Sequence, residues 1–164
     1  MGAQWTRRRL LSVGGTAGLV GIAGCAGGGD RNRWNIEEPI AVTTVRQYNS
    51  PGCSCCEQYA SYLRDNVDGT ITETVPDDID AIKREHGVPS DLRSCHTLTV
   101  GEYVVEGHVP AEVIATLLGE KPDIDGIALP RMPAGAPGMP GQKESSFVIY
   151  ALGGGQTGTE FLTL

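Results

Sequence analysis

The sequence predicts an α/β protein in which a mixed central sheet is flanked by helices. Stretches rich in β-branched residues alternate with segments whose apolar residues recur at steps of three and four, as in strands and amphipathic helices. Two β-branched stretches near the middle of the chain are separated by a two-residue turn, which predicts an antiparallel hairpin. Residues 39–164 have the length of one domain.

The first half of this domain predicts a strand, a helix and a second strand. Ile40–Tyr48 is β-branched and extended, and Asn49–Gly52 is a turn. Cys55–Asn66 carries its apolar residues on one face, as expected of a helix, and Thr70–Val75 alternates like a strand. Because two strands joined through a helix run in the same direction, we expect this pair to be parallel.

The middle of the chain predicts a short helix, the hairpin and a longer helix. The short helix begins after Pro76 and continues to His86, which we place at its C-terminal end. Residues 96–106 form the hairpin. Pro110 occupies a first helical position, and Gly119 is expected to end the last helix.

The C-terminal part predicts a long loop followed by two strands. Pro122–Gly141 contains five prolines and four glycines in twenty residues, a composition typical of a loop. Phe147–Tyr150 predicts a strand, and Glu160–Leu164 predicts another. The first seven elements follow the order β-α-β-α-β-β-α. With cysteines at the junction of the first strand and first helix, this order predicts a thioredoxin-like arrangement.

The N-terminus predicts an export signal. Residues 1–24 combine the arginines Arg7–Arg9 with a run of small and apolar residues, Val13–Ala23, that is too short and too glycine-rich to span a membrane. The run ends at Cys25, in the pattern of a lipoprotein cleavage site. We therefore expect a twin-arginine lipoprotein-type signal, lipidation of Cys25, and residues 25–38 as a flexible tether. The protein would then be exported and anchored on the outer face of the cytoplasmic membrane.

The charge of the chain excludes one class of partner. The formal net charge is −7, although the predicted signal contributes three arginines and no acidic residue. Only three lysines occur, at positions 83, 121 and 143. Because nucleic-acid binding requires a basic face, we expect no nucleic-acid partner.

The cysteines carry the strongest functional signal. Five occur in 164 residues, and Cys53, Cys55 and Cys56 fall within four positions. Cysteines buried in a core are usually solitary and inert, whereas clustered thiolates suit a soft metal ion or a redox centre. Cys95 lies further along, beside His96, where a thioredoxin-like fold returns to the first helix. We therefore expect Cys95 to complete a four-sulfur set, which favours Cu(I).

The same cysteines have two other interpretations, a redox-active pair and a structural zinc site. Cys53 and Cys56 form a Cys-x-x-Cys pair at a helix N-terminus, typical of a thiol-disulfide oxidoreductase in which Cys55 or Cys95 would resolve the intermediate. A structural zinc module is weakened by the absence of a second Cys-x-x-Cys pair. A redox pair needs only two sulfurs, so the third clustered cysteine favours a copper-binding protein over the enzyme.

Several other side chains are candidate ligands with equally plain structural alternatives. His96 is either a ligand or a flanking strand residue, and His108 is either a ligand or a capping and packing residue. Met132 and Met139 lie on the proline- and glycine-rich loop. A thioether suits Cu(I), but a methionine can equally anchor such a loop.

The order of these motifs resembles that of a known family. Cys53-Ser-Cys-Cys56, Ser94-Cys-His-Thr97, Tyr103-Val-Val-Glu-Gly-His-Val-Pro-Ala111 and Gly138-Met-Pro140 are similar to motifs of the small exported proteins of the CopG copper-resistance type. That family was long classed as a domain of unknown function. The resemblance runs from about residue 42 to residue 150, most of the chain after the predicted signal.

The resemblance implies a thioredoxin-like fold and a copper site outside the cytoplasm. It implies that Cys53, Cys55, Cys56 and Cys95 bridge more than one copper ion, with Cu(I)/Cu(II) redox activity and copper resistance as the role. Other copper-handling proteins are the implied partners. The chain departs from the family in its predicted lipid anchor. It also has Arg131-Met-Pro133 where the family often has Gly-Met-Pro, which weakens the assignment of Met132 as a ligand.

Overall fold

The computed structural model describes residues 34–164. The predicted signal, Cys25 and most of the predicted tether lie outside these residues. The strands are β1 (Thr44–Asn49), β2 (Thr70–Thr74), β3 (His96–Val100), β4 (Tyr103–Glu106), β5 (Gly126–Ala128), β6 (Val148–Leu152) and β7 (Glu160–Thr163). The helices are α1 (Ser54–Asn66), α2 (Ile79–Glu85), the 3-10 turn η1 (Ser90–Leu92) and α3 (Ala111–Glu120). Among the described residues, no helix is both long and apolar enough to span a membrane.

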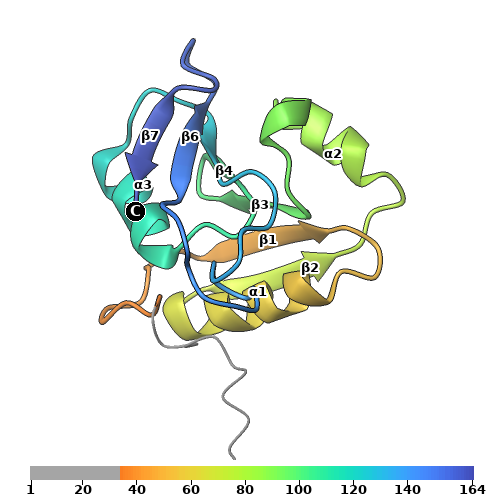
Figure 1. Cartoon of the computed structure of the whole chain (residues 1–164), viewed down its shortest axis with the longest axis vertical. Coiled ribbons are helices and arrows are strands. Elements are labelled where there is room, and N and C mark those ends of the chain that lie inside the picture. The colour runs from red at the N-terminus through yellow and green to blue at the C-terminus, as the bar shows by residue number, and fades with distance from the viewer. Residues whose placement is uncertain (1–33) are drawn as a thin grey trace, which may run out of the picture.

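The seven strands form one mixed sheet in the order β2-β1-β3-β4-β5-β6-β7. β1 pairs with β2 in parallel, as the strand–helix–strand pattern predicted, and β3 and β4 form the predicted antiparallel hairpin. β4 and β5 are also parallel, whereas the remaining pairs are antiparallel. The predicted α/β class with a mixed central sheet is confirmed, and the arrangement is compatible with a thioredoxin-like fold (Figure 1).

Helices cover the two faces of the sheet unequally. The larger core joins α1 and α3 to one face, and its members include Leu63, Leu98, Val105 and Ile114. A smaller core on the other face is built around residues that follow α2, together with sheet residues: Val88, Leu92, Val104, Ala128 and Leu152. Because strand residues alternate between faces, β3 and β4 contribute side chains to both layers.

Several elements differ from the sequence-based expectation: the first strand begins at Thr44 rather than Ile40, and the late strand extends to Leu152. Within the predicted loop, Gly126–Ala128 forms the short strand β5, which is fully buried between β4 and β6. Gly126 fits there because a Cβ on this residue would lie 2.1 Å from the Val104 carbonyl oxygen. The helix α3 runs through Gly119 and ends at Glu120, where Lys121 takes a left-handed φ of 48°.

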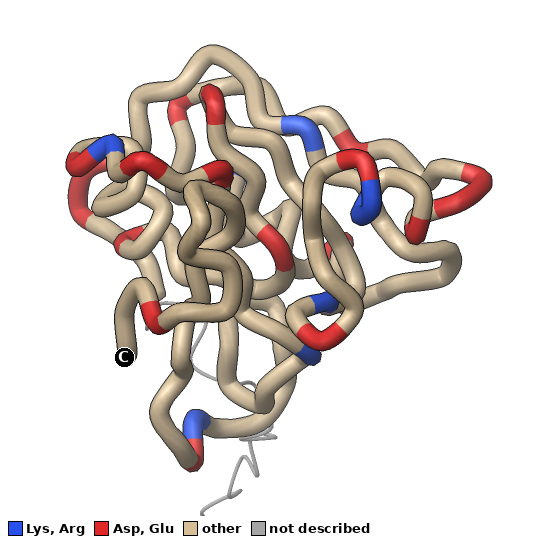
Figure 2. Tube along the Cα trace, turned by 90° about the horizontal axis from the view of Figure 1, so that it is seen from above, with Lys and Arg blue, Asp and Glu red and all other residues tan. Residues whose placement is uncertain are grey.

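Acidic positions predominate around the described fold. Figure 2 shows Asp and Glu spread over the outer turns, with Lys and Arg at fewer places. This distribution agrees with the acidic composition of the chain, whose pI is about 4.9. Basic side chains are few among the described residues, and one of them, Lys83, is buried.

Candidate metal centre

Three cysteines lie at the N-terminal end of α1. Cys53 caps the helix, and its sulfur accepts a hydrogen bond from the Cys56 amide at 3.3 Å. The preceding Gly52 has a φ of 67°, a conformation that favours glycine and turns the chain into the helix. Cys53 and Cys56 are joined by a disulfide, whereas Cys55 is a free thiol whose Sγ lies 3.3 Å from that of Cys53.

Sheet pairing carries Cys95 to the same place. β1 and β3 are antiparallel, and their register sets Asn49 opposite His96. Ser50, just after β1, donates from its amide and from its hydroxyl to the Cys95 carbonyl oxygen, at 3.1 and 2.6 Å. The Cys95 Sγ then lies 3.7 Å from the Cys55 Sγ. The structure therefore brings together the four cysteines that the sequence singled out.

Two histidines flank Cys95 on its buried side. His108 Nε2 lies 3.1 Å from the Cys95 Sγ, and His96 Nδ1 lies 3.4 Å from it. His108 Nδ1 donates to the Pro137 carbonyl oxygen at 2.7 Å, so the Nε2 lone pair is directed at the sulfur. His96 Nε2 is buried and has no hydrogen-bond partner among the described residues.

The proline- and glycine-rich loop positions His108 by packing closely on α1. A Cβ on Gly138, whose φ is 75°, would lie 2.7 Å from the Tyr59 amide nitrogen. Only glycine permits this approach, which holds the neighbouring Pro137 carbonyl against His108. The Tyr59 ring in turn lies 4.6 Å from the His96 ring and 5.2 Å from the His108 ring, measured between centroids.

Both imidazoles are neutral at physiological pH. Burial lowers the pKa of His108 to about 4, although the bond to the Pro137 carbonyl acts in the opposite direction. Burial also lowers the pKa of His96 well below its ordinary value, with further contributions from His108 and Lys83. A neutral imidazole offers a lone pair to a metal ion, so the surroundings of both rings favour ligation.

The Cys95 thiol is protonated in the absence of a metal ion. Burial, together with the neighbouring Cys55, raises its pKa to about 12. A thiol in this state is a weak nucleophile, because only the thiolate reacts. A metal ion that binds here must displace the proton, which is released to solvent.

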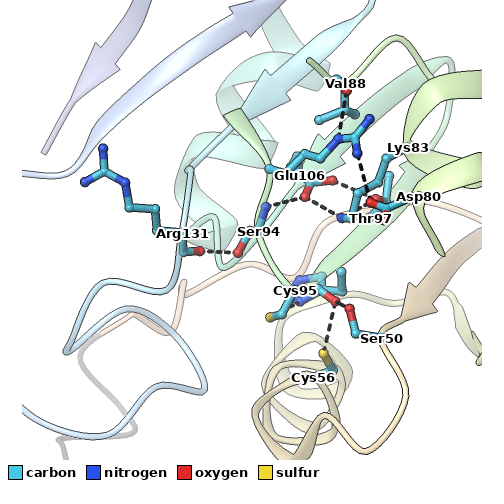
Figure 3. A network of polar contacts seen from close by, with 12 residues as sticks. Ser50, Cys56, Asp80, Lys83, Val88, Ser94, Cys95, Thr97, Glu106 and Arg131 are labelled. Atoms are coloured by element: carbon cyan, nitrogen blue, oxygen red, sulfur yellow. Dashed lines mark hydrogen bonds and ion pairs between the residues drawn. The ribbon is translucent and has the colours of Figure 1, made fainter. Parts of the chain in front are cut away.

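A buried ion pair on the α2 side of the β3–β4 hairpin holds the segment that contains Cys95. Lys83 Nζ donates to Glu106 at 2.5 Å and to the Thr97 hydroxyl at 3.1 Å, and that hydroxyl donates to the other Glu106 oxygen at 2.6 Å. Glu106 also accepts from the Ser94 amide at 2.6 Å (Figure 3). One carboxylate therefore fixes the residues on both sides of Cys95 and His96. Sequence reasoning missed this pair; the signal was an acidic residue within a buried hairpin strand.

The remaining candidate ligands lie elsewhere or outside the described residues. Met132 is 49% exposed, next to Arg131, whose carbonyl oxygen accepts from the Ser94 hydroxyl. Met139 packs against the larger core, which fits a loop-anchoring role. His86 follows α2 as its C-cap. Cys25 lies outside the described residues.

The residues present fit a soft metal ion. Two overlapping groups have all their ligand atoms within 4.8 Å of one another: the four cysteines Cys53, Cys55, Cys56 and Cys95, and the set Cys95, His96 and His108. Thiolates and imidazoles are the ligands that copper accepts in proteins.

The fold and the site define a class of protein: an α/β protein with a cluster of cysteines and histidines that could hold a metal ion. Residues 92–139 match the family described as "Protein of unknown function, DUF411". No curated protein matches the chain. A solved structure of "Copper resistance protein copG", Form 2, is 33% identical and has a TM-score of 0.67, with 77% of this chain and 99% of that chain covered.

A second solved structure supports the same assignment. Form 1 of the copper resistance protein CopG is 31% identical with a TM-score of 0.68, and the match covers 75% of this chain and 98% of that chain. The chain therefore belongs to the CopG family of copper-resistance proteins.

Proposed function

We propose that the protein binds copper through Cys53, Cys55, Cys56 and Cys95 when all four are reduced. The thiolates would bridge more than one copper ion, and the ions would move between Cu(I) and Cu(II). The protein would serve copper resistance by holding copper ions outside the cytoplasm. Membership of a copper-resistance family and the cysteine cluster support this proposal.

The position of Cys55 between two other sulfurs is the observation that carries the proposal. Its Sγ lies 3.3 Å from that of Cys53 and 3.7 Å from that of Cys95. Sulfurs about 2.3 Å from one shared metal ion lie up to about 4 Å apart, so these separations suit sulfurs that share ions. A dithiol enzyme has no need of this third sulfur.

Copper binding by all four sulfurs requires reduction of the Cys53–Cys56 disulfide. Two electrons and two protons convert the disulfide into two thiols, and a dithiol reductant can supply both. Binding then releases the thiol protons, including that of Cys95, whose pKa is raised to about 12 by burial.

A thiol-disulfide oxidoreductase is the second candidate, and the disulfide itself favours it. Cys53 and Cys56 are one turn apart at the N-terminus of α1, where the helix dipole and free amides stabilise a thiolate. Cys53 is partly exposed and Cys56 is fully buried, so a substrate would reach Cys53 first.

Copper stoichiometry and disulfide reduction distinguish the two functions. Reduced protein is loaded with Cu(I) without oxygen, and copper per chain is measured for Cys55→Ser and Cys95→Ser. If the sulfurs share ions, each substitution removes several copper contacts, so stoichiometry should fall sharply. Insulin reduction by the same variants should be negligible. Ser54→Ala is the matched control, since Ser54 is exposed and lies between Cys53 and Cys55.

The oxidoreductase predicts the opposite pattern. Cys55→Ser would then keep most of its insulin-reducing activity, because Cys53 and Cys56 remain. Full copper retention in both cysteine variants, together with insulin turnover in the parent protein, would replace the copper-binding proposal by the enzyme.

We further propose export and lipid anchoring at Cys25, on the basis of the arginines and the small-residue run that precede it. Cys25→Ser should release the protein from the membrane and leave the copper stoichiometry unchanged. Copper ions and other copper-handling proteins would be its partners. Loss of a copper equivalent on Cys25→Ser would show that this cysteine belongs to the metal site.

A further inference from the structure

Formation of the disulfide affects the two ligand sets of the metal centre differently. Formation of the Cys53–Cys56 bond removes two of the four sulfurs from the first set. The second set consists of Cys95, His96 and His108, and it contains neither bonded cysteine. Its ligand atoms stay within 4.8 Å of one another in the structure that contains the disulfide.

We propose that the disulfide form retains a smaller site for one copper ion, formed by the Cys95 thiolate and the imidazoles of His96 and His108. The protein would then bind copper in two states: a cysteine cluster when reduced, and a one-sulfur, two-nitrogen site when oxidised. This inference rests on the proposed copper-binding function and adds which ligands remain active in each redox state.

The distances in the disulfide form fit a shared ion. Ligand atoms that surround one ion at 2.0–2.3 Å lie about 3–4 Å apart. The Cys95 Sγ lies 3.1 Å from His108 Nε2 and 3.4 Å from His96 Nδ1. His108 is already oriented by the Pro137 carbonyl, so binding requires little reorganisation of its ring.

Charge and burial favour this set over a pair of thiolates. The competing site would use Cys55 and Cys95, whose sulfurs lie 3.7 Å apart. Two thiolates on one Cu(I) leave a net charge of about −1, whereas one thiolate with two neutral imidazoles leaves none. Cys55 and Cys95 are only partly buried, but Cys95 lies against the fully buried rings of His96 and His108, where an uncompensated charge is disfavoured.

Binding is balanced without any electron transfer. The Cys95 S–H bond breaks, a sulfur–Cu(I) bond forms, and one proton is released to solvent. Both imidazoles coordinate through lone pairs and keep their remaining ring protons. Neither the disulfide nor the oxidation state of copper changes in this step.

The test compares the two redox forms of one protein. The Cys25→Ser variant of the full chain is used so that the disulfide form has two free thiols and the dithiothreitol-reduced form has four. Each form is titrated with Cu(I), without oxygen, against a coloured Cu(I) chelator. We expect one copper per chain in the disulfide form and a higher stoichiometry in the reduced form.

Two substitutions identify the ligands of the disulfide form. His108→Gln should lower its copper affinity by at least about tenfold, since a ligand is lost. Cys55→Ser should lower the stoichiometry of the reduced form, while the disulfide form still binds one copper. X-ray absorption of the copper-loaded disulfide form should show one sulfur and two nitrogen neighbours.

Contrary outcomes separate this inference from the proposed function. Copper binding by the reduced form alone would overturn the inference and leave the proposed function intact, whereas no binding by either form would overturn both. If Cys55→Ser abolished binding to the disulfide form and His108→Gln did not, a dithiolate site would replace ours. Circular dichroism, and copper binding by reduced His108→Gln, show whether that variant folds.

Discussion

Two buried polar clusters occupy opposite faces of the β3–β4 hairpin. On the α2 side, Lys83, Thr97 and Glu106 bond to one another and to the Ser94 amide. On the α1 side, His96 and His108 lie against Cys95, and His96 Nε2 has no partner among the described residues. Their sequence positions interleave, because neighbouring strand residues point to opposite faces.

The difference separates a structural cluster from a binding cluster. The first cluster pairs its charges and satisfies its donors, as expected of a buried ion pair that fixes the backbone. The second cluster contains neutral rings, a protonated thiol and an unpartnered nitrogen. The Cys95 sulfur, His96 Nδ1 and His108 Nε2 form no part of the ion-pair network and lie close enough together to share one metal ion.

The largest expected effect comes from breaking the ion pair on the α2 side. Lys83→Met leaves the Glu106 carboxylate buried without its cation, so the free energy of unfolding should fall by about 3–5 kcal/mol. Urea unfolding of the metal-free protein measures this loss. Arg84→Met is the matched control, since the neighbouring Arg84 makes an exposed pair and its loss should change stability little. A small effect of Lys83→Met would contradict the structural role of this cluster.

Next in size is the effect of acid on the α1 side. The pKa of His108 is about 4 when folded and about 6.5 when unfolded, so between these values the unfolded state binds the extra proton. Stability is therefore fully present above about pH 6.5 and falls as the pH decreases toward 4, by up to about 3 kcal/mol. Melting temperatures of the metal-free protein should show this slope, and His108→Gln should flatten it. If the parent protein and His108→Gln lost stability equally as the pH falls, the claim that His108 is a buried neutral ring would be contradicted.

A pair of neighbouring substitutions compares the clusters directly. Thr97→Val removes a partner of both Lys83 and Glu106, so it should lower the free energy of unfolding by about 1–3 kcal/mol. His96→Leu replaces a ring with an unpartnered nitrogen, so it should change stability by less than about 1 kcal/mol. In the disulfide form, by contrast, His96→Leu should lower the copper affinity more than Thr97→Val does. Greater destabilisation by His96→Leu would assign that histidine a structural role.

Much of the fold follows from local sequence signals. The turn and apolar spacing after Tyr48 predicted a helix over Cys55–Asn66, and α1 spans Ser54–Asn66. The short strand β5 was missed because its three residues lie among prolines and glycines, and its burial depends on pairing with β4 and β6. No local pattern encodes such long-range pairing.

The candidate site divides in the same way. Clustering marks Cys53, Cys55 and Cys56 in the sequence, whereas the approach of Cys95 depends on the register of β1 and β3. The orientation of His108 depends on a carbonyl 29 residues away, and the Cys53–Cys56 pairing has competitors that spacing alone does not exclude. Contacts of this kind follow from tertiary packing. The sequence therefore identifies the candidate residues better than it assigns their roles.

X-ray absorption at the copper edge of the reduced, copper-loaded protein tests the central claim most directly. If copper is held by the four cysteines at the end of α1, the first shell should be dominated by sulfur, with a smaller nitrogen contribution from the histidines. A first shell of nitrogen and oxygen alone would contradict the claim and place copper elsewhere on the protein.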